Sequence, residues 1–334
     1  MKVPQVSVLL PYKNADQYLE KCLNSIKDQL EDNELILVEN QLEDSLVVSE
    51  FIRQNPQLNI LKIKELNTGI VYALNTGLLH CKGQFIARMD ADDEMPHNRL
   101  KHQSEFLLNN PEIDLVSGLV EYIGDIDKNR GFYLYVEQLN AIKSVGEISS
   151  LRFIESPFAH PSVMFRKSAI DHPELYKHGS FPEDYELWLR WLNQGKKMAK
   201  INSIVVRWFD REDRLSRTDP IYSNDAFKQL KTRYLILWIK ENVPSHKNIV
   251  VAGVGKLAKP IIQQFIENNI QIAAITDLKK RSYLNLPFIP WNAITNPSET
   301  FIVSLVSNRG SWQIIRKELE SRGYLMMNDF ILCA

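Results

Sequence analysis

The sequence contains few of the features that mark secreted, membrane-spanning or nucleic-acid-binding proteins. Its three cysteines, Cys22, Cys81 and Cys333, are odd in number and far apart, so they form neither a disulfide framework nor a zinc signature and favour a reducing compartment. No apolar run approaches the roughly 18 residues of a membrane span; the densest, YLILWI at 234–239, is short. The apolar stretch near the N-terminus is too brief for a signal peptide. The formal net charge of −1 provides no basic field for nucleic acid. We therefore expect a cytoplasmic protein without a nucleic-acid partner.

What the sequence does contain is a regular alternation of apolar runs and helical patterns. A chain of 334 residues with 44% hydrophobic and 24% charged residues has the composition of a globular protein with one large domain or two. Leu19, Leu23 and Ile26 recur at helical spacing between two apolar runs. Such alternation predicts an α/β fold with a mostly parallel, doubly wound sheet. The expected strands are 6–10, which Pro11 stops, then 34–40, 59–64 and 85–87, with a helix at about 70–80.

The middle of the chain carries further helical signals around one irregular segment. Pro96 stands where a helix can begin. The segment from about 125 to 155 is less regular, and we expect a loop-rich excursion over the substrate region. An apolar helical stripe then ends near Gly195, and a long amphipathic helix is expected at about 222–239. The stripe consists of Leu187, Trp188, Trp191 and Leu192, and its two tryptophans are expected in the core.

A change of composition divides the chain. Residues 242–247 (NVPSHK) are polar and contain a proline, as linkers do. We therefore predict a first domain at 1–241 and a smaller α/β domain at 248–334.

The stretch Gly83 to Asp93, GQFIARMDADD, is the most informative of the chain. Its apolar run reads as a buried strand that ends in Asp90, Asp92 and Asp93. In open α/β sheets, ligands bind beyond this end of the strands. Asp90 and Asp92 are two residues apart and share a face on an extended backbone, where they repel each other unless a cation lies between them. A hard divalent cation that holds a phosphate satisfies this requirement. The alternative is an acidic turn that caps the next helix.

Other polar residues are predicted at the same edge of the sheet. Pro11-Tyr12 follows the first strand, Glu39 ends the second, and Glu183-Asp184 lies farther along the chain. A metal with a nucleotide diphosphate would neutralise this much carboxylate, and Glu39 could accept hydrogen bonds from a base. One distant acid would remain as a general base.

Taken in order, the motifs VSVLLPYKN, ELILVEN, NTGIVYALNTG, GQFIARMDADD, HPSVMFR and PEDYELWLRW resemble those of the inverting, bacterial-type glycosyltransferases of family 2, which have the GT-A fold. The resemblance covers about residues 4–240. It implies transfer from a nucleotide-sugar donor, most simply a UDP-sugar, with Mn²⁺ or Mg²⁺ as cofactor. In the D-x-D motif it places Asp90 near the ribose and the metal and makes Asp92 a metal ligand. It also implies that Glu39 reads the uracil and that Asp184 is the catalytic base.

The same resemblance extends to residues around the donor and to the acceptor. Pro11, Tyr12, Asn67 and Gly69 are expected at the nucleotide, and Arg217, with Arg214, would add positive charge to the diphosphate from a mobile loop. The implied acceptor is a glycan or lipid-linked glycan of surface polysaccharide synthesis. Peripheral association with the inner face of the membrane would follow from such an acceptor, although nothing in the sequence clearly lies on a bilayer.

Two departures from the family pattern keep an alternative open. Glu39-Asn40-Gln41-Leu42 stands where the family usually has Asp-Asp-Gly-Ser, which affects base recognition and the preference for UDP. A histidine metal ligand of some relatives is also replaced near 208–210, where Asp210 or water would take its place. The alternative is a non-catalytic nucleotide-sugar-binding or scaffold protein. A nucleotidyltransferase is disfavoured, because PYKNADQY at 11–18 offers no glycine-rich, basic phosphate loop.

The second domain carries a motif of its own. Gly253-x-Gly255-x-x-Ala258 follows an apolar strand, and Asp277 ends the next one, which matches a dinucleotide-binding fingerprint in its alanine variant. Roughly 90 residues suffice for one mononucleotide-binding half but not for a full dinucleotide fold. We expect a Rossmann-like accessory domain for assembly or acceptor docking that does not bind NAD(H) tightly.

Overall fold

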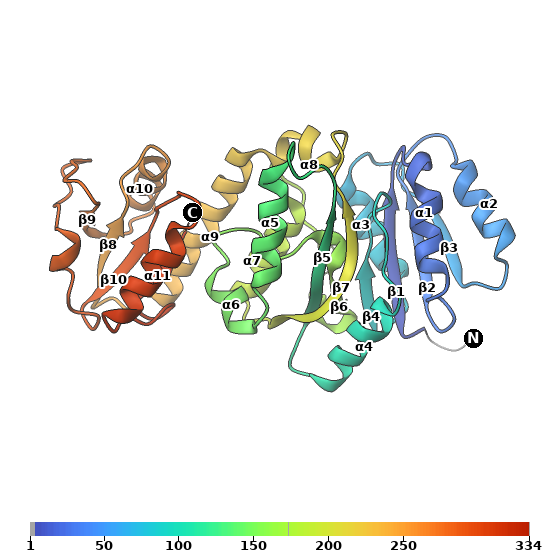
Figure 1. The fold of residues 1–334 in the computed structure, drawn as a ribbon, viewed down its shortest axis with the longest axis horizontal. Helices are drawn as coiled ribbons and strands as arrows, with labels where there is room; N and C mark the ends of the chain where they lie inside the picture. The colour runs from blue at the N-terminus through green and yellow to red at the C-terminus, as the bar shows by residue number, and fades with distance from the viewer. Residues whose placement is uncertain (1–3, 173, 334) are drawn as a thin grey trace. The chain divides into compact units, whose positions relative to one another are not determined.

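The computed structural model describes residues 4–172 and 174–333, and its contacts divide the chain into two compact units. The first unit comprises residues 1–148 and 157–223, and the second comprises 149–156 and 224–334 (Figure 1). The helix α9 (Asn224–Asn242), predicted at 222–239, belongs to the second unit, which thus begins before the predicted linker at 242–247. In the described part of the chain, no helix combines the length and the apolar character that crossing a membrane requires.

The first unit is built on a seven-stranded sheet with the order β3-β2-β1-β4-β6-β5-β7. Every pairing is parallel except those of β6, which runs antiparallel to both of its neighbours. The predicted mostly parallel sheet is therefore confirmed. The strands are β1 (Val6–Tyr12), β2 (Glu34–Glu39), β3 (Ile60–Lys64), β4 (Phe85–Arg88), β5 (Leu115–Ile123), β6 (Met164–Arg166) and β7 (Met198–Phe209).

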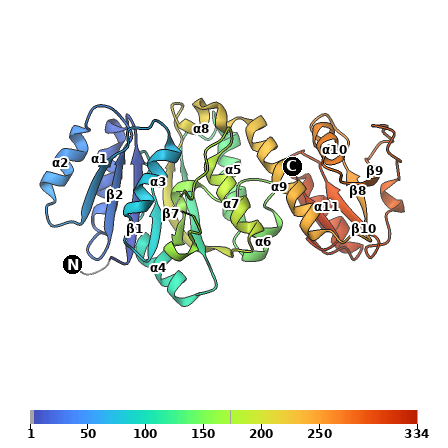
Figure 2. The same ribbon diagram turned by 180° about the vertical axis from the view of Figure 1, so that it is seen from behind.

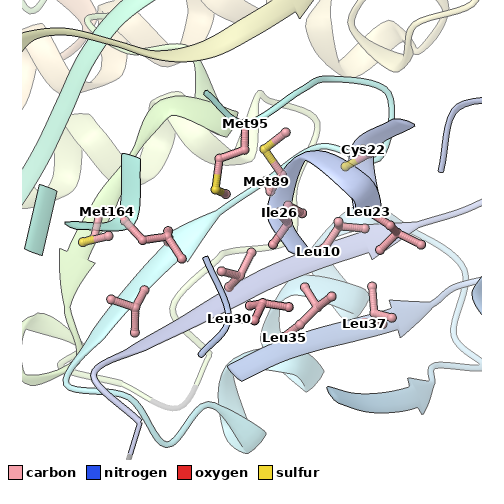
Figure 3. Packing of buried hydrophobic residues seen from close by; sticks show 14 of the residues in the cluster. Leu10, Cys22, Leu23, Ile26, Leu30, Leu35, Leu37, Met89, Met95 and Met164 are labelled. Carbon is pink, nitrogen blue, oxygen red and sulfur yellow. The ribbon is translucent and has the colours of Figure 1, made fainter. Parts of the chain in front are cut away.

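Helices cover both faces of this sheet. The buried core lies beneath the first helices, where Leu23 and Ile26 of α1 pack against Leu10 and Leu37 of the strands (Figure 3). The opposite face carries α3, seen in Figure 2. The helices are α1 (Asp16–Lys27), α2 (Leu46–Gln54), α3 (Ile70–His80), α4 (Arg99–Asn109), α5 (Arg130–Ala141), α6 (Val145–Ser150), α7 (Glu183–Asn193) and α8 (Leu215–Thr218).

The close packing of α3 depends on a glycine. A Cβ atom added to Gly77 would lie 2.3 Å from Leu9 Cδ1 and 2.8 Å from Val38 Cγ2. Contacts this short do not occur between real atoms, so with any larger residue the Leu9 and Val38 side chains or the helix itself would have to shift. Gly77 therefore fixes the distance at which α3, and the loop that leads into it, sits on the sheet.

The predicted end of the first strand and the predicted start of the fourth helix are wrong. β1 runs through Pro11 to Tyr12, because the partner strand β4 pairs only as far as Leu9, so no hydrogen bond to β4 is lost at the proline. Helix α4 begins at Arg99 rather than near Pro96, because Asn98 has a left-handed φ of 61° that a helix does not accommodate.

The segment 125–155 is not the loop-rich excursion that we expected. It contains the helices α5 and α6. Val136 and Leu139 of α5 are buried against Val120 of β5 and Val206 of β7. The apolar spacing of these residues is helical, and burial of that face on β5 and β7 overrides the irregular polar pattern around it.

The stripe around Trp188 and Trp191 forms α7 as predicted, with both side chains fully buried. Gly195, at φ 80°, follows the helix as its C-terminal glycine, and the N–H of Lys196 donates to the carbonyl of Trp191 at 3.0 Å.

The second unit contains a four-stranded, wholly parallel sheet with the order β11-β10-β8-β9. Counted from β8, this is the order 2-1-3-4, which is the beginning of the flavodoxin-like doubly wound order rather than the 3-2-1 order of a Rossmann half. The apolar run DFILCA at 329–334 predicts a last strand, and its final residue, Ala334, lies outside the described residues. Besides α9, the elements are β8 (Asn248–Ala252), α10 (Ala258–Glu267), β9 (Ile272–Thr276), β10 (Thr300–Ser304), α11 (Ser311–Ser321) and β11 (Phe330–Leu332).

Candidate active site

The strand order creates a switch point beside β1. The chain builds outward from β1 through β2 to β3 and then returns to place β4 on the other side of β1. Adjacent crossovers that diverge in this way leave a crevice at the carboxyl ends of the strands, where α/β proteins bind ligands. Tyr12, Glu39 and Asp90 stand at or just beyond these ends, as the sequence predicted.

The three predicted acids beyond β4 form a cluster. Carboxylate oxygens of Asp90, Asp92 and Asp93 lie within 4.8 Å of one another. Asp90 and Asp92 are partly exposed, whereas Asp93 is buried and accepts the backbone N–H of Phe209 at 2.9 Å. Burial raises the pKa of Asp93 to about 8 against the opposing charge of Arg214. Three converging oxygen donors, two of them open to solvent, suit a hard divalent cation.

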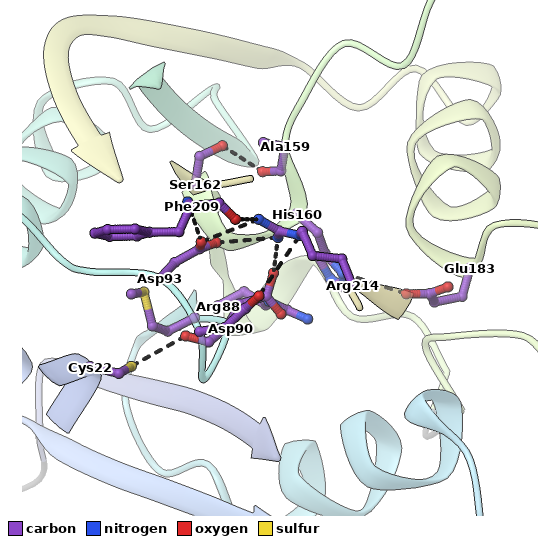
Figure 4. Close-up of polar contacts among 12 residues, drawn as sticks. Cys22, Arg88, Asp90, Asp93, Ala159, His160, Ser162, Glu183, Phe209 and Arg214 are labelled. Carbon is purple, nitrogen blue, oxygen red and sulfur yellow. Dashed lines mark hydrogen bonds and ion pairs between the residues drawn. The ribbon is translucent and has the colours of Figure 1, made fainter. Parts of the chain in front are cut away.

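Arginines neutralise this cluster in the structure (Figure 4). Arg214 reaches all three acids, with nitrogen–oxygen distances of 3.6 Å to Asp90, 3.8 Å to Asp92 and 3.4 Å to Asp93. Arg88 forms an ion pair with Asp90. Although burial alone would raise the pKa of Asp90, the charges of Arg88 and Arg214 hold it below its usual value. The three carboxylates therefore fit a metal ion. In this structure the guanidinium of Arg214 supplies the positive charge that such an ion would supply.

Arg214 and its neighbour Arg211 are fixed by aromatic and backbone contacts. The guanidinium of Arg214 lies 4.4 Å from the centroid of the Trp208 ring and donates to the Phe209 carbonyl at 2.7 Å. Arg211 lies 3.6 Å from the Tyr18 ring centroid and 3.6 Å from an Asp92 oxygen. The segment after β7 thus folds back over the acids.

Arg217, which we predicted at the diphosphate, has other partners. It pairs with Asp210 at 2.5 Å and stacks on Phe132 at 4.3 Å from the ring centroid. Asp210 also accepts the hydroxyl of Tyr122 at 2.6 Å. Asp210, which we considered as a replacement for a histidine metal ligand, is therefore paired with Arg217 and Tyr122. The acid that joins Asp90 and Asp92 in the cluster is Asp93.

The predicted base lies in the first turn of α7. Asp184 is partly exposed and accepts the N–H of Tyr185 at 2.7 Å. Burial of its carboxyl, followed by the negative charge of Glu183, raises the pKa of Asp184 to about 8. The charge of Arg88 lowers the pKa of Asp184 and the charge of Asp90 raises it, both less than burial and Glu183 do.

Glu183 organises the surroundings of Asp184. It accepts the hydroxyl of Tyr222 at 2.6 Å and lies 3.6 Å from Nδ1 of His160. His160 in turn is 2.9 Å from the hydroxyl of Tyr176. Burial, together with the charge of Arg88, lowers the pKa of His160, so its ring is neutral at neutral pH. The His160 side chain is buried.

Glu39 is fully buried and engaged by the protein itself. One carboxylate oxygen accepts the hydroxyl of Tyr12 at 3.0 Å and the N–H of Ser45 at 2.7 Å. The other lies 3.0 Å from the ammonium of Lys62. The Glu39 carboxylate, at the end of β2, therefore connects β1, β3 and the start of α2.

A cleft of about 680 Å³ lies beyond the ends of β1, β2 and β3. Asn40, which lines it, donates to the carbonyls of Glu65 and Asn67 at 3.0 and 2.8 Å and accepts the N–H of Gly69 at 2.9 Å. The predicted Asn67-Gly69 turn is thus brought to the cleft by Asn40. The lining residues are Lys13, Asn14, Asp16, Gln17, Asn40, Gln41, Leu42, Glu43, Asp44, Glu65, Leu66 and Thr68.

Sequence reasoning missed the roles of Asn40, Arg88 and Arg211. Arg88 had a usable signal, because it is two residues from Asp90 and shares its face on an extended backbone. Asn40 was noted only as a departure from the family pattern. Arg211 is distant in sequence from the acids, and no local pattern connects them.

Comparison with known proteins assigns the chain to a family. The sequence model of glycosyl transferase family 2 matches residues 7–172. The O-antigen biosynthesis glycosyltransferase WbnJ of Escherichia coli is 32% identical over 192 residues, which are 57% of this chain and 72% of that protein. The chain belongs to glycosyl transferase family 2. A second E. coli relative, a UDP-Gal:alpha-D-GlcNAc-diphosphoundecaprenol beta-1,3-galactosyltransferase, is 28% identical over 76% of this chain and 90% of its own length.

Solved structures confirm the GT-A fold of this family 2 glycosyltransferase. Staphylococcus aureus TarS, residues 1–349, in complex with UDP-GlcNAc, superposes with a TM-score of 0.54 at 16% identity and covers 79% of this chain and 72% of that one. The mannosyltransferase PcManGT of Pyrobaculum calidifontis, in complex with GDP-Man and Mn²⁺, has a TM-score of 0.50 at 18% identity and covers 79% and 70%.

Proposed function

We propose that this enzyme transfers a sugar from a UDP-sugar to a hydroxyl of a glycan or lipid-linked acceptor, with inversion at the anomeric carbon and with Mn²⁺ or Mg²⁺ on the diphosphate. The cluster of Asp90, Asp92 and Asp93 at the switch point of the sheet is the observation that carries the proposal. The UDP-Gal in the name of one relative and the UDP-GlcNAc bound to one structural neighbour support the choice of nucleotide. Surface polysaccharide synthesis is the proposed setting, after the O-antigen relative.

The acids hold the donor's charged end. Asp90 and Asp92 are the proposed metal ligands because they are partly exposed, and Asp90 would also lie near the ribose. The bound ion supplies positive charge that stabilises the leaving diphosphate. With an ion held by these acids, Arg214 would exchange its contacts with Asp90 and Asp92 for the phosphates of the donor, which its guanidinium is suited to bind.

Asp184 is the proposed base. It takes the proton of the acceptor hydroxyl while that oxygen attacks the anomeric carbon from the side opposite the departing UDP. A pKa of about 8 gives the ionised carboxylate a strong affinity for this proton near neutral pH. Glu183, held by Tyr222 and His160, orients the first turn of α7 and supplies part of the charge that raises the pKa of Asp184.

The cleft beyond β1, β2 and β3 is the proposed site of the uridine. Its size is suited to a nucleoside, and Asn40 holds the Asn67-Gly69 turn against it. Tyr12 and Glu39 directly precede the lining residues Lys13 and Asn40, and Glu39 would meet the uracil only by exchanging one of its present hydrogen bonds. Pro11 precedes Tyr12 in β1 and is a further proposed neighbour of the nucleotide.

Substitution of the base tests this proposal. Asp184→Asn removes the proton acceptor and should lower transfer, measured as acceptor-dependent UDP release from a panel of UDP-sugars, by at least about 100-fold. Binding of UDP, measured by calorimetry, should persist. Asp127→Asn, a change at an exposed acid, is the matched control and should leave both unchanged. Full transfer by Asp184→Asn would refute the assignment, and UDP binding without transfer by the wild type would favour a binding or scaffold role.

A further inference from the structure

Two loops of the second unit meet at the carboxyl ends of β8 and β9. The first runs from Gly253 to Leu257, and the second from Asp277 to Asn285. The N–H of Gly253 donates to the carbonyl of Thr276 at 2.9 Å, and the N–H of Val254 donates to the Asp277 carboxylate at 2.9 Å. The two loops are therefore tied together and present one surface, which we call the loop edge.

The loop edge exposes three leucines. Leu278 is 99% exposed, Leu257 54% and Leu284 46%. A single exposed leucine is ordinary on a protein surface. Three on two adjoining loops, one of them with almost its whole surface in water, are the arrangement found where apolar side chains enter another phase or partner.

The same loops are strongly basic. The exposed cations Lys256, Lys279, Lys280 and Arg281 lie in the two loops, and the exposed Lys259 lies in the first turn of α10. The acid within the two loops is Asp277, and it is already paired with Arg281 at 3.0 Å. The loop edge therefore carries a net positive charge around its leucines, although the chain as a whole has a formal net charge of −1.

The acid that follows the second strand of this unit, Asp277, contacts groups of the protein itself. In nucleotide-binding folds the acid after the second strand binds a ribose, and the turn offers its N–H groups to phosphate. Here Asp277 binds the turn's Val254 N–H and Arg281 instead. That the unit does not bind NAD(H) tightly stays a prediction.

We propose that the loop edge docks on an anionic lipid surface, with Leu278 and Leu257 inserted among the lipids and the lysines facing the headgroups. Exposed leucines at loop tips, surrounded by cations, match a bilayer interface in both polarity and charge. The inference goes beyond the proposed function and does not depend on it, because docking requires neither donor nor metal. A lipid-linked acceptor would then be presented to an enzyme already at the membrane.

Vesicle flotation of the full chain tests the proposal. Wild type should float with vesicles that contain one third phosphatidylglycerol and stay unbound with pure phosphatidylcholine, and added salt should weaken the binding. Leu278→Ala/Lys279→Ala/Lys280→Ala should reduce the partition coefficient at least about tenfold, since each cation near the surface contributes substantially. Ile314→Ala/Lys317→Ala on α11, which also removes one exposed apolar residue and one exposed lysine of the same unit, is the control.

Absence of wild-type binding to anionic vesicles, or equal binding by the triple variant, would overturn the proposal. An equal loss of vesicle binding in the α11 control would also overturn the proposal, because the binding could then not be assigned to the loop edge. UDP binding by each variant is measured in parallel. A triple variant that loses vesicles but keeps UDP separates this surface from the donor site.

Discussion

Arg214 offers the sharpest test of how the acid cluster is neutralised. Its guanidinium contacts three carboxylates at 3.4–3.8 Å and is 9% exposed. Removing one partner of such a buried ionic group lowers the free energy of unfolding by about 3–5 kcal/mol. Arg88 and Arg211 still neutralise part of the negative charge, so we expect a loss at the lower end, about 3 kcal/mol, for Arg214→Ala. For a unit of roughly 200 residues this corresponds to a fall in Tm of about 6–12 °C.

The metal should compensate for the missing arginine. In EDTA, differential scanning fluorimetry should show the full loss of Tm for Arg214→Ala. Saturating Mn²⁺ should raise the Tm of this variant more than that of the wild type, because a cation then faces the carboxylates without a competing guanidinium. Arg217→Ala, which breaks the pair with Asp210 away from the acids, should lose stability without this extra gain. A variant whose Tm in EDTA stays within about 1 °C of wild type would refute the reasoning.

Three further predictions concern the base, the packing of α3 and the donor cleft. Because Asp184 works only when ionised and its pKa is about 8, kcat/KM for transfer should rise with pH below about 8, reach half of its maximum there and level off at about pH 9; a flat profile would contradict the assignment. Gly77→Ala should destabilise the protein by about 1–3 kcal/mol in urea unfolding through its clash with Leu9, whereas Gly131→Ala, with no atom within 4 Å of the new Cβ, should not. Asn40→Ala, which frees the loop before α3, should weaken UDP binding at least about fivefold in calorimetry, and unchanged affinity would remove the cleft from the donor site.

Local patterns predicted much of the fold. The apolar runs that became β1, β2 and β4 and the spacing that became α1 were identifiable because each strand is buried on both faces and each helix buries one stripe. Helix α5 could not be identified from the sequence, because only a short set of apolar residues is buried and polar residues surround them. Helix α4 begins after Asn98, which has a left-handed backbone conformation. Pro96 suggested an earlier start, because proline is common in the first turn of helices.

The candidate site was predicted in composition but not in its internal contacts. Asp90, Asp92 and Asp184 carry their chemistry in their positions along the chain, and the fold clusters Asp90 and Asp92 with Asp93. The partners of Glu39 and of Arg214 could not be predicted, because they come from segments far away in sequence. Arg214 reaches Asp93 across more than a hundred residues, and only the assembled sheet determines that contact.

Calorimetric titration of UDP into the full chain, with and without Mn²⁺, tests the central claim most directly. The measurement is made on wild type and on Asp92→Ala, which removes one proposed metal ligand from the cluster. We predict that UDP binds the wild type tightly only when Mn²⁺ is present, and that Asp92→Ala loses this metal-dependent binding. UDP binding that is the same with and without Mn²⁺, or unchanged in Asp92→Ala, would contradict a donor site built on these acids.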